Sequence, residues 1–127
     1  MSMRWELYLA FAEEVLGSQW PAKLQEAAAR SAVSRAYYAV FHCARPRLER
    51  EGVVLPTDGS AHGEVMRAYE QRGDRERRQI ANILRELRND RRDADYDDHA
   101  TLSPNAATIL DRAKQCMLLL ARLPESP

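Results

Sequence analysis

The sequence predicts an all-α protein, built as a four-to-five-helix up-and-down bundle. Apolar residues recur at helical spacing in every long segment, and we find no strand-type alternation of useful length. Short stretches of glycine, proline and other turn residues separate these segments, which is typical of helices joined by short loops. A chain of 127 residues suits one compact domain, so we expect a single domain over residues 1–127.

The first two helices are expected at about 3–16 and 19–51. Gly17 is placed to end the first helix, and Ser18 is expected to cap the second, with Pro21 in its first turn. The second helix has a wide apolar face rich in alanine, so neighbouring helices can approach it closely. Pro46 is expected to kink this helix or end its regular part, because proline lacks the N–H that continues the helical hydrogen bonds.

Three further helices are expected at about 61–72, from about 75 to the ADYD segment, and at about 104–123. The segment GVVLPTDGSAHG before them has the composition of a loop. Gly73 is expected to break the chain between the third and fourth helices, and Asp74 to cap the fourth. The segment TLSPN supplies a cap and an early proline for the last helix.

The apolar stripe of the fourth helix continues into an arginine. Leu84 and Leu87 lie on this stripe, and a step of four residues from Leu87 reaches Arg91, while Arg88 and Arg92 flank it. Because an unpaired buried charge is costly, Arg91 is expected to have a partner.

Charge is distributed unevenly along a chain whose formal net charge is zero. The net charge does not indicate attraction of the whole molecule to nucleic acid. Residues 72–92, however, hold eight arginines and four acidic residues. Arginine suits planar phosphate and carboxylate groups better than lysine does. The sequence therefore predicts a local basic segment on a neutral protein.

The sequence also indicates the cellular compartment of the protein. No apolar run approaches the roughly 20 residues that a membrane span requires. The N-terminal apolar stretch contains acidic residues, unlike a signal peptide. We therefore expect a cytoplasmic protein without membrane contact. Cys43 and Cys116 lie in apolar helical contexts and are expected to be buried, reduced thiols.

No metal or other cofactor is expected. The run DADYDDH offers carboxylates at alternate positions, but it lacks the central glycine and the closing glutamate of a calcium-binding EF-hand. The three histidines have neither HExxH nor CxxC-type neighbours, which argues against zinc.

Three sequence blocks occur in order over about residues 31–97. They are SAVSRAYYAVFHCAR at 31–45, the His62-Gly63 pair, and the segment from Leu87 through Arg91 to ADYD at 94–97. Together these blocks resemble those of HEPN domains, small helical bundles named for nucleotide binding in prokaryotes and higher eukaryotes. The short, single-domain prokaryotic branch of that superfamily is the most similar.

The resemblance implies a homodimer that forms through the second and fourth helices. Many HEPN domains are metal-independent endoribonucleases, often toxins paired with a small nucleotidyltransferase antitoxin. Their motif is an arginine, usually followed by Asn, Asp or His, with a histidine four to six intervening residues later. Arginine can hold the scissile phosphate, and histidine can move the proton of the 2′-hydroxyl.

This chain departs from that motif, and two registers can be tried. With Arg88-Asn89 as the arginine pair, Ala94 stands where the histidine belongs. With Arg92-Asp93 as the pair, six intervening residues lead to His99, which lies beyond the expected end of the helix. The candidate catalytic residues are therefore Arg88, Arg91, Arg92 and His99, and the first register leaves the motif without its histidine.

Four other residues are candidates for binding or modification. In some toxin pairs the antitoxin attaches AMP to the tyrosine two residues after the motif histidine, and Tyr96 has that place in the first register. Alternatively, Tyr96 anchors the turn before the last helix. Arg35, Tyr38 and His62 are candidate substrate-binding residues, because a tyrosine can stack on a base and a histidine at a helix start can contact an anion. Each also has a structural interpretation, as core or interface packing.

The sequence thus predicts a protein that engages RNA or a nucleotide through an arginine-rich cleft at a dimer interface, in a toxin–antitoxin or phage-defence setting. Cleavage of RNA without a metal is one form of this function. Two alternatives remain open. One is a non-catalytic partner module that binds a nucleotidyltransferase or another protein, with the arginines in structural ion pairs. The other is a nucleotide-binding domain without cleavage.

Overall fold

In the computed structural model, which describes residues 3–124, the chain forms five α-helices and no strand. They are α1 (Glu6–Gly17), α2 (Ala22–Arg50), α3 (Ala61–Gln71), α4 (Arg75–Tyr96) and α5 (Ala106–Arg122). The predicted all-α class is confirmed. None of these five helices has the length and apolar content needed to cross a membrane.

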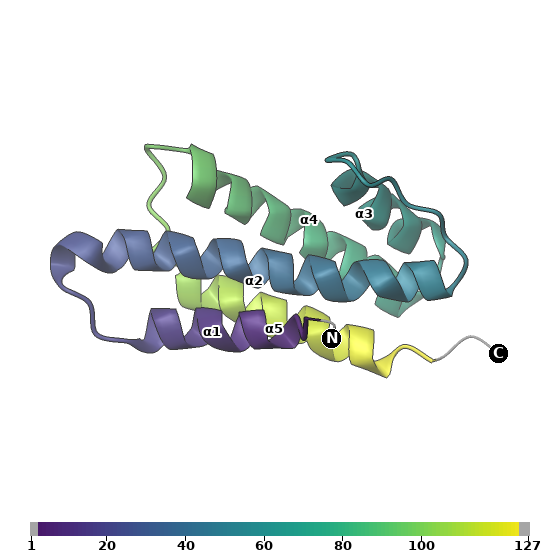
Figure 1. The fold of residues 1–127 in the computed structure, drawn as a ribbon, viewed down its shortest axis with the longest axis horizontal. Coiled ribbons are helices and arrows are strands. Elements are labelled where there is room, and N and C mark those ends of the chain that lie inside the picture. The colour runs from purple at the N-terminus through teal and green to yellow at the C-terminus, as the bar shows by residue number, and fades with distance from the viewer. Residues whose placement is uncertain (1–2, 125–127) are drawn as a thin grey trace.

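α2 is the central helix of the bundle, and each of the other four helices packs against it. Figure 1 shows α1 and α5 on one side of α2, with α3 and α4 on the other. The four long helices α1, α2, α4 and α5 alternate in direction, as in an up-and-down bundle. The short helix α3 lies in the connection between α2 and α4, and it packs mainly against α4.

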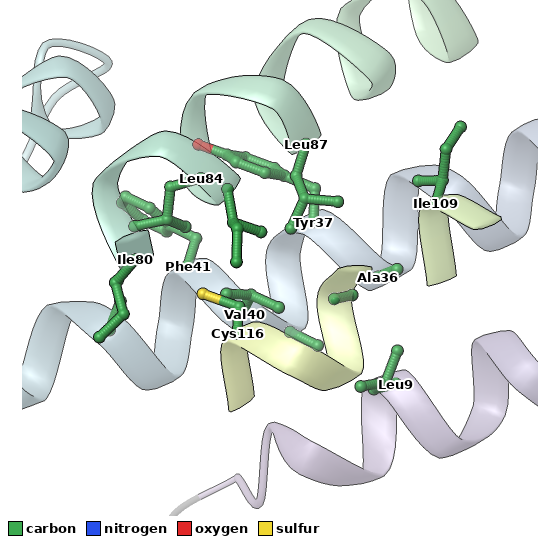
Figure 2. Packing of buried hydrophobic residues seen from close by; sticks show 14 of the residues in the cluster. Leu9, Ala36, Tyr37, Val40, Phe41, Ile80, Leu84, Leu87, Ile109 and Cys116 are labelled. Atoms are coloured by element: carbon green, nitrogen blue, oxygen red, sulfur yellow. The ribbon is translucent and has the colours of Figure 1, made fainter. Parts of the chain in front are cut away.

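The core combines small residues of α2 with larger residues of its neighbours. Because alanine adds little bulk, the axes of the neighbouring helices can approach α2 closely. Figure 2 shows Leu9 of α1, Leu84 of α4 and Cys116 of α5 beside the central helix. Burying a leucine fully contributes about 1.5–3 kcal/mol. The fully buried alanines of α2 are Ala29, Ala32, Ala36, Ala39 and Ala44.

Neither cysteine forms a disulfide in the described structure. Burial raises the pKa of the Cys116 thiol to about 12 and that of Cys43 to about 11. Both side chains are therefore protonated thiols at neutral pH, which makes them poor nucleophiles.

The helix ends follow from local chemistry. α2 ends in a Schellman motif, in which Gly52 has a φ of 91°, its N–H donates to the Glu49 carbonyl, and Val53 N–H donates to the Leu48 carbonyl. Gly73, with a φ of 82°, separates α3 from α4 as expected. Asp74 caps α4 by accepting from the Arg77 N–H at 2.8 Å, so that prediction is confirmed.

The predicted cap of α2 is wrong, and one of the two outcomes expected at Pro46 is not observed. Ser18 does not cap α2: its N–H and its hydroxyl both donate to the Glu14 carbonyl, so it caps the end of α1 instead. Pro21, not Ser18, precedes the first residue of α2. The regular part of α2 does not end at Pro46, because the helix continues to Arg50. The exposed proline lacks the N–H that would donate to the carbonyl four residues earlier.

An ion pair in the first turns of α2 fastens the end of α4. Arg30 donates to the backbone carbonyls of Asp93, Ala94 and Ala100. Its partner Glu26, at 3.0 Å, accepts the backbone N–H of Leu102 at 2.8 Å. A cation at the last carbonyls of a helix also interacts favourably with the helix dipole. These contacts fix where α4 stops and where the ADYD segment lies.

A buried ion cluster joins the end of α2 to the start of α4. The Glu51 carboxylate, with a side chain 4% exposed, accepts from Nε of Arg47 at 2.9 Å and from Nη2 of Arg77 at 2.6 Å. Burial acts to raise the pKa of Glu51. The hydrogen bonds from Arg47 and Arg77 outweigh that effect, so the pKa lies below its ordinary value of 4.5.

Replacing Glu51 with glutamine should lower the free energy of unfolding by about 2–4 kcal/mol, because buried guanidinium groups lose their carboxylate. Since the pKa of Glu51 is lowered in the folded protein, its stabilisation is complete above pH 4.5 and is lost as the pH falls through the lowered pKa. Urea unfolding at neutral and acidic pH measures both effects. Glu49→Gln is the control, since Glu49 is 47% exposed and 3.7 Å from Arg45. Equal losses in the two variants would contradict this role for the cluster.

Candidate functional site

The three arginines near the end of α4 lie on two faces of the helix. Arg88 and Arg92 are one turn apart and line a cleft against α3, whereas Arg91 points to the tyrosines of α2. This division follows from the helical period, because residues four apart share a face and adjacent residues are 100° apart. Of these three arginines, Arg91 is therefore buried, and Arg88 and Arg92 border a cleft.

Arg91 is 8% exposed and lies among aromatic rings. Its guanidinium carbon is 5.7 Å from the ring centroid of Tyr37, 5.4 Å from that of Tyr38 and 5.6 Å from that of Tyr96. A cation over an aromatic face is stabilised by about 0.5–2 kcal/mol, depending on its desolvation. The partner that the sequence requires for Arg91 is therefore chiefly aromatic.

The carboxylate of Asp95 completes the surroundings of Arg91. Nη1 of Arg91 donates to Oδ2 of Asp95 at 3.4 Å, a long contact, and Nε of Arg91 has no partner in the described structure. The same Oδ2 accepts from the Ser34 hydroxyl at 3.2 Å. The first and third sequence blocks are thus in direct contact through Ser34, Asp95 and Arg91.

A cleft of about 330 Å³ lies between α3 and α4. Arg85 pairs with Glu70 across this cleft, and Arg67 pairs with Glu64 on α3. Arg88 and Arg92, in contrast, form no hydrogen bond or ion pair with any part of the chain that the structure describes. The residues that line the cleft are Gly63, Met66, Arg67, Glu70, Arg85, Arg88, Asn89 and Arg92.

Arg88 reaches the start of α3. A β-carbon at Gly63 would lie 3.9 Å from Nη1 of Arg88, which is ordinary van der Waals contact. The Nε of Arg88 is buried and lacks a hydrogen-bond acceptor among residues 3–124. Buried polar atoms in folded proteins are nearly always hydrogen-bonded, so an unsatisfied guanidinium nitrogen at a cleft needs an explanation. An anionic ligand supplies one.

His62, in the first turn of α3, is held by two aromatic residues of α2. Its Nδ1 lies 2.6 Å from the Tyr37 hydroxyl oxygen, and its ring stacks on Phe41 with centroids 4.3 Å apart. Burial lowers the pKa of His62, and the charges of Arg88 and Arg91 lower it further. Figure 2 shows the Tyr37 ring within the core, with its oxygen at the end away from the α2 backbone. Burial also raises the pKa of Tyr37, so its phenol stays protonated.

The structure brings some of the predicted residues together and leaves others apart. Tyr38 and Tyr96 contact Arg91, and the Tyr38 ring is 6.2 Å from that of His62. Arg35 instead lies over Phe11 of α1, at 5.4 Å from its ring centroid. His99 is exposed after the end of α4, where its backbone N–H donates to the Asp97 carboxylate.

The motif position itself offers no proton acceptor. Ala94 is 6% exposed and belongs to the core, so a histidine in its place would displace packed side chains. His42, on α2, stacks on Trp5 with ring centroids 3.9 Å apart. Burial lowers the pKa of His42, followed by the charge of Arg45. Its place between α1 and α2 fits the structural interpretation.

Met66, Arg67, Glu70 and Arg85 line the cleft but were not singled out from the sequence, unlike Arg88 and Arg92. Arg85, Arg88, Asn89 and Arg92 follow a spacing of three, four and seven residues, which places them on one face of α4. That spacing can be recognised in the sequence. The sequence does not show which residues of α3 line the cleft, because only the tertiary packing places Gly63 and Arg67 opposite this face.

The acidic segment at the end of α4 does not converge on one point. No group of three or more histidine, cysteine, aspartate or glutamate side chains in residues 3–124 could hold a metal ion. The polar groups that line the cleft are the guanidinium groups of Arg67, Arg85, Arg88 and Arg92, the amide of Asn89 and the carboxylate of Glu70. Guanidinium groups without a carboxylate partner can bind a phosphate.

Comparison with known proteins identifies a family for this chain. A family model described as HEPN domain matches residues 21–123, which include α2 through α5. Neither the curated proteins nor the solved structures that were searched gave a match.

Replacing Arg91 with lysine should lower the free energy of unfolding by about 1–2 kcal/mol, because an ammonium keeps the charge but loses the planar contact with three tyrosine rings. Arg92→Lys is the matched control on the neighbouring, exposed residue, and should change stability by less than about 0.5 kcal/mol. Urea unfolding of both variants measures the difference. Equal stability of the Arg91 variant and wild type would show that the tyrosines do not hold this guanidinium.

Proposed function

The chain belongs to the HEPN domain family, and from this premise we propose that it engages RNA or a nucleotide through Arg88 and Arg92. The binding site is the cleft between α3 and α4. The physiological setting is a prokaryotic toxin–antitoxin or phage-defence system.

The observation that carries this proposal is the unpaired state of the two arginines. Most arginines of the described structure with buried guanidinium groups have carboxylate, carbonyl or aromatic partners, as Arg30, Arg47, Arg77 and Arg91 do. Arg88 and Arg92 have none in residues 3–124, although the buried Nε of Arg88 requires an acceptor. A phosphate between them would supply charge-assisted acceptors to both groups.

The cleft also has suitable size and chemistry. A volume of about 330 Å³ lies at the small end of the range for ligand pockets, about 300–1,000 Å³. That volume accommodates a phosphate with its sugar, and an RNA strand can extend from it into solvent. Asn89 lies beside the arginines and can donate or accept hydrogen bonds. A neutral protein with one basic cleft would bind by local contacts and not by long-range attraction.

A partner module remains the second candidate function, and one observation favours it. Tyr96 is 75% exposed, so its hydroxyl is accessible to an enzyme such as a nucleotidyltransferase. In this alternative the arginines form structural ion pairs. Of Arg88, Arg91 and Arg92, only Arg91 forms one in the described structure, with Asp95. Asp90 is directed instead to Arg112 of α5, at 3.6 Å.

We also propose that the chain forms a homodimer. Large apolar side chains are exposed on α1 and around the start of α2, and such surface is typical of association sites. A second copy would cover Leu7, Phe11, Trp20 and Leu24, which are 39–51% exposed. This interface differs from the one through the second and fourth helices that the resemblance implies. Sedimentation equilibrium should give a dimer for wild type and a monomer for Phe11→Glu. A monomeric wild type would contradict the proposal.

The double variant Arg88→Ala/Arg92→Ala should bind single-stranded RNA more weakly at every salt concentration. Each lost phosphate contact should reduce the slope of log K against log salt by about 0.7, so the double variant should lose about 1.4. Fluorescence anisotropy with a labelled oligoribonucleotide measures both quantities. Arg50→Ala/Arg122→Ala removes the same charge from exposed positions outside the cleft, and should preserve the wild-type slope.

A pair of glycine variants tests the cleft without a change of charge. Gly63→Ala fits, because the added methyl group makes ordinary contact with Arg88, whereas Gly63→Leu places a side chain in the cleft and should weaken RNA binding. Unchanged binding in the arginine and leucine variants would overturn the proposed site. If wild type does not retain RNA but binds a nucleotidyltransferase in a manner that Tyr96→Phe abolishes, the partner module replaces it.

A further inference from the structure

We propose that the outer face of α4 binds double-stranded RNA. This inference rests on the proposed RNA-binding function and names the class of RNA, which has an unpaired segment in the α3–α4 cleft and a paired stem along α4. Five exposed residues of α4 define this face, and we call them the outer stripe. They are Arg78, Asn82, Arg85, Asn89 and Arg92.

The outer stripe forms one line along the helix. Its members follow steps of four, three, four and three residues, and residues with this spacing share a face of a helix. At 1.5 Å per residue, the line from Arg78 to Arg92 is about 21 Å long. Every member carries a guanidinium or an amide group, and none is acidic or apolar. Such a line suits an anionic partner that also forms hydrogen bonds.

The acidic residues next to the outer stripe lie on a separate flank of α4. Glu86, Asp90 and Asp93 follow steps of four and three residues, which places them together on the side of α5. Arg112 of α5 lies 3.3 Å from the Glu86 carboxylate and 3.6 Å from that of Asp90. Two of these carboxylates therefore already have a cationic partner other than the outer stripe.

The arginines at the two ends of the outer stripe are available to a ligand. The side chains of Arg78 and Arg92 form no hydrogen bond or ion pair with residues 3–124. Arg85, between them, pairs with Glu70 of α3, and both side chains of this pair are about half exposed. Exposed ion pairs contribute little to stability, so phosphate groups can compete for Arg85.

The composition of the outer stripe favours a paired RNA over a single strand. Proteins that hold single strands combine a basic groove with aromatic side chains on which bases stack. The outer stripe has no aromatic member, and Tyr96 lies one turn beyond its end. Double-stranded RNA presents 2′-hydroxyls in a wide, shallow minor groove and is recognised through them and its phosphates. Arginine binds the phosphates, and asparagine, which both donates and accepts, binds the 2′-hydroxyls.

The outer stripe and the cleft share an edge. Arg85, Asn89 and Arg92 line the cleft, whereas Arg78 and Asn82 extend the stripe beyond it towards the start of α4. A strand that leaves the cleft can therefore continue along α4. The stripe matches about six base pairs of a duplex, at roughly 3.4 Å for each pair. A free nucleotide is too short to contact both surfaces.

Fluorescence anisotropy with three labelled probes tests the duplex surface. They are an RNA hairpin of about twelve base pairs with a single-stranded tail, the tail alone, and the same hairpin made of DNA. Wild type should bind the RNA hairpin most tightly. Arg78→Ala should lower the magnitude of the hairpin's slope of log K against log salt by about 0.9, which corresponds to one phosphate contact. Binding of the tail should not change.

Arg50→Ala is the matched control for Arg78→Ala. It removes the same charge from an exposed position at the end of α2, so it should keep the wild-type slope. Arg78→Ala should fold normally, because the Arg78 side chain has no partner within residues 3–124 and alanine is the best helix former.

Asn82→Ala tests the contact with the 2′-hydroxyls. This variant should bind the RNA hairpin more weakly and should bind the DNA hairpin as wild type does, because DNA lacks the 2′-hydroxyl. The ratio of the two affinities measures the effect.

The duplex surface and the cleft fail separately. If wild type binds the tail and the RNA hairpin equally, or if Arg78→Ala keeps the hairpin's slope, the duplex surface is rejected. Binding of the tail that Arg88→Ala/Arg92→Ala weakens would still support the cleft. Equal affinity of wild type for the RNA and DNA hairpins contradicts the assignment to RNA. If wild type binds none of the three probes, both proposals are overturned.

Discussion

The burial of the Arg91 charge between α2 and α4 is the constraint on which the site depends. A guanidinium that is 8% exposed needs compensating partners, and three tyrosine rings with one carboxylate supply them. These partners fix the rotation of α4 about its own axis relative to α2. Once Arg91 faces α2, the helical period directs Arg88 and Arg92 to the α3 side.

Tyr37 belongs to the core of the bundle and also contacts Arg91 and His62. The face of its ring contacts Arg91, and its hydroxyl meets His62. A substitution there changes packing and site geometry together, so a loss of activity in a Tyr37 variant cannot be assigned to one cause. The peripheral side chains of Arg88 and Arg92 are better probes, because they contribute no hydrogen bond or ion pair within residues 3–124.

Much of the fold follows from sequence, because helical periodicity and turn residues are local signals. The five helices, the Asp74 cap and the break at Gly73 are examples. The cap of α2 was assigned wrongly to Ser18 because a serine between two helices can cap either one. In the structure its hydroxyl donates to the Glu14 carbonyl at the end of α1. The site was harder to predict: the motif arginines are visible, but the contacts of His62 with Tyr37 and Phe41 join residues 21–25 positions apart in the chain.

The central claim is that α4 divides its arginines between a structural role and a ligand-binding role. Side-chain NMR of the arginine Nε–Hε groups tests it most directly, during titration with a short single-stranded oligoribonucleotide. We expect the Arg88 and Arg92 resonances to shift in a saturable manner, while Arg91 keeps its position among the tyrosines. A shift of Arg91 with Arg88 and Arg92 unmoved would contradict the division, and with it the assignment of the cleft between α3 and α4.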